Sequence, residues 1–121
     1  MIINLTQHPA TPEQRAEGVF DLSGEMLDYL KTLLNFEGLP TVGEVYDRAG
    51  KLADITGEFE CRKALIGGAP FLMAPLANSL NEKGIEPLCA FSKRDSVEET
   101  LSDGTVKKVS VFRHAGFVPA V

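Results

Sequence analysis

The stretch Ala64-Leu65-Ile66-Gly67-Gly68-Ala69-Pro70 decides the fold, because an apolar run meets a glycine turn and then a proline suited to a helix start. Arg62–Ile66 predicts a buried strand, and the helix after the turn is expected to end at Gly84. Pro87–Ser92 is the next apolar strand. Two apolar strands joined by a helix are typical of a right-handed βαβ unit with parallel strands.

The chain before this unit predicts further strands and helices. Strands are expected at Met1–Leu5 and Val19–Leu22, and Thr11 begins a short helix with a capping box and a proline at its first position. Longer amphipathic helices are expected after Ser23, around the Met26–Leu34 stripe, and over Thr41–Thr56, where Gly57 should end the helix.

After Ser92 the pattern changes to that of a hairpin. Ser96–Leu101 and Thr105–Phe112 flank an Asp103-Gly104 turn, which predicts two antiparallel strands at one edge of the sheet. We therefore expect one domain over residues 1–121. Its fold class is α/β, a Rossmann-like three-layer domain with a central, mainly parallel sheet and a C-terminal β-hairpin.

The charge of the chain limits its partners. The 121 residues carry a formal net charge of −5, which argues against affinity for duplex nucleic acid. The charge is uneven, since residues 1–92 carry 7 Lys and Arg against 13 Asp and Glu, giving −6, whereas residues 93–121 carry 5 against 4, giving +1. The C-terminal part is therefore the better place for an anion site.

Other classes of protein have little support. The two cysteines suggest neither a disulfide framework nor a zinc site, and no metal or cofactor is predicted. No signal peptide or membrane-spanning run is visible, so a cytoplasmic protein without a membrane partner is expected.

Three junctions between elements should meet at the carboxyl ends of the parallel strands, where open α/β sheets bind ligands. They are Thr6-Gln7-His8, Gly67-Gly68-Ala69 and Ser92-Lys93-Arg94. Arg113 and His114 would return to the same edge if the hairpin doubles back.

Each of these groups has a chemical role and a plainer alternative. The glycines would free backbone N–H groups for an anion, although a tight turn packed on the sheet also explains them. His8 could shuttle protons near neutral pH, although a histidine beside a proline is often a turn residue bonded to backbone. Lys93 and Arg94 would bind phosphate, unless they form an exposed loop pair.

The C-terminal third resembles a known family. Pro87-Leu-Cys-Ala-Phe-Ser-Lys-Arg94, Asp103-Gly-Thr-Val-Lys-Lys108 and Val111-Phe-Arg-His-Ala-Gly-Phe117 are similar to the ending of small CRISPR-associated proteins of the CARF (Rossmann-fold) ring-nuclease type. The glycine turn suits that type, and the resemblance covers about residues 62–117. The opening Asn4-Leu-Thr-Gln-His-Pro9 also resembles a set of small bacterial and prophage proteins without an assigned role.

The resemblance implies a homodimer that binds a cyclic oligoadenylate and cleaves it without a metal. His8, His114 and Arg94 would then be catalytic. The residues expected to bind the ligand are Thr6, Gln7, Gly67, Gly68, Ala69, Ser92, Lys93 and Arg113. Residues 23–56 have no counterpart in the family. Two other functions stay open: a non-catalytic module that senses a nucleotide, and a structural or interaction protein with no small-molecule ligand.

Overall fold

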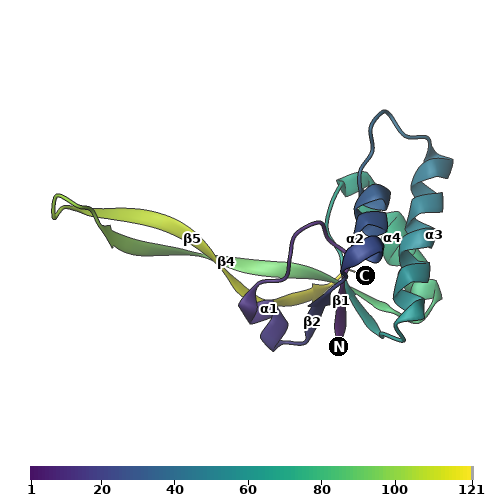
Figure 1. The fold of residues 1–121 in the computed structure, drawn as a ribbon, viewed down its shortest axis with the longest axis horizontal. Helices are drawn as coiled ribbons and strands as arrows, with labels where there is room; N and C mark the ends of the chain where they lie inside the picture. The colour runs from purple at the N-terminus through teal and green to yellow at the C-terminus, as the bar shows by residue number, and fades with distance from the viewer. Residues whose placement is uncertain (121) are drawn as a thin grey trace.

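The computed structural model describes residues 1–120 and contains a five-stranded mixed sheet with four helices (Figure 1). In chain order the elements are β1 (Ile2–Asn4), α1 (Pro12–Ala16), β2 (Val19–Asp21), α2 (Gly24–Leu34), α3 (Val42–Glu58), β3 (Lys63–Leu65), α4 (Pro70–Glu82), β4 (Glu86–Thr100) and β5 (Val106–Pro119). The α/β class and the C-terminal hairpin are confirmed.

The strands follow the order β2-β1-β3-β4-β5. Neighbours among the first four run parallel, and β5 alone is antiparallel to its neighbour β4. In the register Ile3 lies between Phe20 and Ala64, and Ala64 lies opposite Pro87. The prediction that the three apolar runs form parallel strands is therefore confirmed, and β3-α4-β4 is the expected βαβ unit.

The main hydrophobic core lies between one face of the sheet and helices α2, α3 and α4. Ile3 and Ala64 from the sheet, Leu30 from α2, Leu52 from α3 and Leu76 from α4 are all fully buried there. The Met26–Leu34 stripe was expected to face the core, and the burial of Leu30 confirms that assignment.

The opposite face of the sheet has a thinner cover. A second cluster contains Ile2, Val19, Leu65 and Leu88, with Ala10 from the segment before α1 packed against it. Helix α1 buries none of its own five residues, so it shields this face without contributing to the core.

The helix starts follow the capping signals. Thr11 and Gln14 form the reciprocal capping box of α1, and Thr41 accepts a hydrogen bond from the N–H of Glu44 at the start of α3. The prediction that Gly57 ends α3 is wrong, since the helix continues through Gly57 to Glu58. Glycine weakens a helix without stopping it when the following residues still bond to the preceding turn.

The hairpin differs most from expectation. A strand ending at Ser92 and a separate strand from Ser96 were predicted, but β4 runs without a break from Glu86 to Thr100. Its first residues pair with β3, and its whole length from Leu88 onward pairs with β5. Ser92-Lys93-Arg94 therefore lies within a strand and is not a loop at a strand end.

One irregularity interrupts the β4–β5 ladder. Phe91 pairs with Gly116, whereas Ser92 pairs with His114, so β5 holds one extra residue, Ala115, at this point. Gly116 has a φ of +153°, which glycine adopts more readily than other residues. This β-bulge marks the place where the hairpin leaves the body of the protein.

No helix within residues 1–120 is long and apolar enough to cross a bilayer.

Candidate functional site

A pocket of about 680 Å³ lies at the carboxyl ends of β1 and β3. Thr6, Gln7 and His8 line it after β1, and Gly67 and Gly68 line it after β3. The remaining lining residues are Pro9, Thr11, Gln14, Leu65, Ile66, Met73, Cys89 and Ala90. Two of the three predicted junctions, those after β1 and β3, therefore line one concave site. This follows because parallel strands end at the same edge of a sheet.

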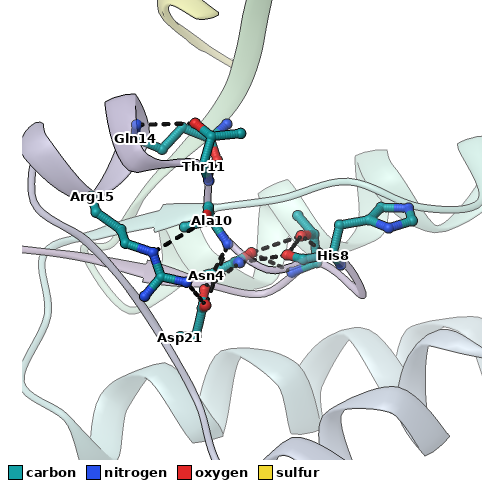
Figure 2. Close-up of polar contacts among 8 residues, drawn as sticks. Asn4, His8, Ala10, Thr11, Gln14, Arg15 and Asp21 are labelled. Atoms are coloured by element: carbon teal, nitrogen blue, oxygen red, sulfur yellow. Dashed lines mark hydrogen bonds and ion pairs between the residues drawn. The ribbon is translucent and has the colours of Figure 1, made fainter.

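The side chain of Asn4 holds the loop after β1 in place (Figure 2). Its Nδ2 donates to the carbonyl of His8 at 2.8 Å and to Oδ1 of Asp21 at 2.8 Å. Its Oδ1 accepts from the N–H of Thr6 at 2.9 Å and from the Thr6 hydroxyl at 2.7 Å. Asn4 is only 3% exposed, and its two donors and two acceptor sites are all used.

Asp21, at the end of β2, extends this clamp to the segment before α1 (Figure 2). Its carboxylate accepts from the N–H of Ala10 at 3.0 Å and from the Arg15 guanidinium at 2.9 Å. Arg15 also donates from Nε to the carbonyl of Ala10. The loop that forms one wall of the pocket is thus bonded at both ends to buried or half-buried polar groups, which preorganises it.

The glycine turn forms the facing wall. A Cβ on Gly67 would lie 3.3 Å from Cγ2 of Thr6, so glycine lets the two loops approach each other. Gly68 has a φ of +145°, where other residues are strained. The N–H groups of Gly67, Gly68 and Ala69 make no hydrogen bond within residues 1–120. They lie at the N-terminus of the 13-residue helix α4, where anions are stabilised.

His8 is the one imidazole that lines this pocket. Its backbone is held by Asn4, while its exposed ring points away from the clamp in Figure 2 and makes no hydrogen bond within residues 1–120. The ring is therefore available to a ligand. Ala69 does not line the pocket, since its side chain packs against the main core at the N-cap of α4.

The third junction is not brought to the pocket. Ser92, Lys93 and Arg94 are exposed residues of β4, and Cys89 and Ala90 of the same strand line the pocket instead. The Arg94 guanidinium lies 5.9 Å from the centre of the Phe112 ring. No lysine or arginine is among the residues that line the pocket in the described chain.

Arg113 and His114 also lie elsewhere. Arg113 pairs with Asp95 at 3.2 Å across the exposed hairpin. The His114 side chain is 4% exposed, and its ring centre lies 4.8 Å from that of Phe117, on the face covered by α1. Its Nε2 is 3.3 Å from a carboxylate oxygen of Glu17, but neither ring nitrogen has a well-aligned hydrogen bond within residues 1–120.

Sequence reasoning missed Asn4 and Asp21, the two residues that shape the loop. Each stands at the last position of a short strand, and an Asn or Asp at a strand end is a signal for a local side-chain bond to the following turn. Read in that way, Asn4 two residues before Thr6 would have indicated the turn.

Residues 1–120 contain no group of three or more His, Cys, Asp or Glu side chains placed to hold an ion. Cys61 is a buried thiol outside the pocket, and burial raises its pKa.

Comparison with known proteins places the chain in a family. No curated protein and no solved structure matches it. The model of the Uncharacterized protein MJ1673 family matches residues 1–118, which is almost the whole chain and includes every part of the pocket. The chain therefore belongs to the Uncharacterized protein MJ1673 family.

Proposed function

We propose that this protein binds a small anionic nucleotide in the pocket at the carboxyl edge of its sheet. The observation that carries the proposal is the glycine turn at the start of α4, which lines the pocket together with the Asn4-clamped loop and offers N–H donors that make no hydrogen bond within residues 1–120. Phosphate groups bind such donors at helix N-termini. The amides of Gln7 and Gln14 line the same space, and Oε1 of Gln7 and Nε2 of Gln14 make no hydrogen bond within residues 1–120, so these two atoms suit a ribose or a base.

The resemblance to CARF-type ring nucleases makes a cyclic oligoadenylate the ligand that we propose, bound by a Rossmann-like homodimer. Cleavage would join a ribose 2′-oxygen to the adjacent phosphorus and break the bond from phosphorus to the 5′-oxygen. The 2′-OH proton would end on the released 5′-oxygen. We assign His8 to carry that proton, because its ring is exposed at the pocket and makes no hydrogen bond within residues 1–120.

A second function, sensing without cleavage, is favoured by the scarcity of acid–base groups. Apart from His8 and the Cys89 thiol, the lining residues of the described pocket carry no titratable side chain. Without a cation beside it, the developing charge on a cleaved phosphate would have backbone donors alone. A sensor that binds the nucleotide without cleaving it would need only hydrogen-bond donors such as the N–H groups of the glycine turn.

The experiment is incubation of purified protein with labelled cyclic oligoadenylates of several ring sizes, followed by calorimetry for binding and chromatography for products. Binding with turnover supports the ring-nuclease form, and binding alone supports the sensor. His8→Ala should abolish turnover and leave binding within about threefold, because the ring is exposed and does not hold the loop. Absence of binding by the wild-type protein would refute the proposal.

A matched pair of glycine variants tests the position of the ligand. Gly68→Ala, at φ +145°, should weaken binding at least tenfold. Gly38→Ala changes a glycine with open space around it and should leave binding unchanged. Equal effects of both variants would show that the turn does not form the site.

A further inference from the structure

The hairpin extends far beyond the body of the protein. We call residues 92–115 the arm; it contains the outer parts of β4 and β5 and the turn between them, and it projects away from the helices in Figure 1. Its residues are exposed or half-buried, except that the His114 side chain at its base is only 4% exposed. A two-stranded ribbon without a covering layer is only marginally stable in water, so an ordered arm of this length calls for a surface to lie on.

The arm has the features of a contact surface. On one face Val97 lies directly opposite Val109, with Val111 two residues further along. On the other face Phe112 is 71% exposed and Val106 is 57% exposed. Both edges of the ribbon beyond β3 lack a neighbouring strand in the sheet, and open edges of this length readily pair with another chain.

Charge indicates which surface the arm fits. The arm carries five of the chain's 12 Lys and Arg residues and four acidic residues, giving +1, whereas residues 1–92 carry −6. The acidic body of a second copy therefore attracts the arm. Duplex nucleic acid suits it less well, because four carboxylates would lie among the five cations.

The position of the arm connects it with the pocket. Cys89 and Ala90 form part of the pocket wall, and the arm begins at Ser92 in the same strand. The arm thus leaves the sheet at the edge where the pocket lies, and its nine β4 residues span about 30 Å. Two copies related by a two-fold axis between the arm bases would each lay an arm along the other's carboxyl edge.

We propose that the arm of one copy docks across the carboxyl edge of a second copy and brings its cations to a pocket that no lysine or arginine lines in residues 1–120. The role of those cations in binding a nucleotide rests on the proposed function of the pocket. The contact between the two copies does not depend on that function. The dimer is isologous, so each pocket receives the arm cations of the other copy.

Sedimentation equilibrium measures whether the arm joins two copies. The wild-type chain should have twice the chain mass at micromolar concentration. Phe112→Ser, in the arm, should weaken the dimer at least tenfold. Leu39→Ser, the matched control on the body, removes a fully exposed side chain and should leave the dimer intact. A wild-type protein that stays monomeric at about 100 μM, or equal dissociation of both variants, would overturn the proposal.

Cross-linking then locates the contact without any ligand. A reagent that joins a thiol to an amine is applied to a mixture of ¹⁴N- and ¹⁵N-labelled protein, and mixed-isotope peptides report links between copies. Cys89 of one copy should be linked to the arm lysines Lys93, Lys107 or Lys108 of the other, and Cys89→Ser should remove these links. Links between Cys89 and Lys93 of one copy are expected in any case, because the two residues lie four positions apart in β4. Absence of mixed-isotope links from Cys89 to the arm, or interchain links to Lys31 or Lys51 of the body alone, would overturn the docking. If the interchain links form and no nucleotide binds, the arm contact stands and the proposed function fails.

Discussion

The Asn4 clamp makes a quantitative prediction through Asn4→Asp, which changes two donor hydrogens into an acceptor and keeps the shape. In the folded variant the new carboxyl oxygen would lie about where Nδ2 now is, 2.8 Å from both the His8 carbonyl and the Asp21 carboxylate. Two carboxylates at that distance do not both ionise, so the pair holds a proton and one pKa rises well above its ordinary value. A carboxyl group with an ordinary pKa near 3.9 is ionised at pH 7. Keeping it protonated in the folded protein lowers the free energy of unfolding by at most about 4 kcal/mol.

The loss of one hydrogen bond adds about 1 kcal/mol, because the protonated acid donates once where the amide donates twice. We expect Asn4→Asp to lower the free energy of unfolding by about 3–5 kcal/mol at pH 7 and by about 1 kcal/mol at pH 4. The sign follows from proton binding: the folded variant keeps its proton to a higher pH than the unfolded chain, so its stability falls as the pH rises.

Urea unfolding at both pH values, with wild type at each, provides the measurement, and urea avoids screening of the charges. Asn78→Asp is the matched control, since Asn78 is exposed on α4 and should change stability by less than about 0.5 kcal/mol. A loss of less than about 1 kcal/mol at pH 7 would refute the clamp, as would an equal loss at the two pH values.

Three further outcomes are expected. Leu30→Ala should cost about 2–5 kcal/mol in urea unfolding because Leu30 is fully buried between α2 and the sheet, whereas Leu39→Ala, at a fully exposed site, should cost less than about 0.5 kcal/mol. In the proposed dimer, Arg94→Ala should weaken nucleotide binding more than Lys107→Ala does, since Arg94 lies near the arm base and its planar guanidinium would contact a phosphate of the other copy's ligand in two places; equal losses in calorimetry would indicate diffuse electrostatics. The Cys61 thiol, whose pKa is raised by burial, should react with iodoacetamide at pH 8 at least ten times more slowly in the folded protein than in urea, and similar rates would place it at the surface.

The parallel part of the sheet was predictable because its strands are buried on both faces. Runs such as Ala64–Ile66 are uniformly apolar, and the Gly67-Gly68 pair after them is typical of a tight turn. The same reasoning predicted that Thr6–His8 and Gly67–Gly68 lie at one edge of the sheet, because the carboxyl ends of parallel strands point the same way.

The hairpin was predicted from its Asp103-Gly104 turn, but the unbroken course of β4 through residues 92–95 was not, because no core imposes a pattern there. Polar residues such as Lys93 and Arg94 usually indicate the end of a strand, but here the partner strand alone keeps the backbone extended. The clamp was missed for a related reason: the bonds of Asn4 reach Asp21, 17 positions away, and only the assembled sheet places the two side chains together.

The bulge at Ala115 determines which insertions and deletions the hairpin can accept without exchanging its two faces. Side chains alternate between the two faces of a ribbon, so inserting or deleting one residue in β5 exchanges the faces of everything beyond it. Ala115 is the exception, since it has no partner on β4, and deleting it leaves His114 opposite Ser92 as before. Natural relatives should therefore vary in arm length by pairs of residues, one from each strand, and single-residue gaps should fall at the bulge. A library of deletions through β5 would show one tolerated position among its neighbours.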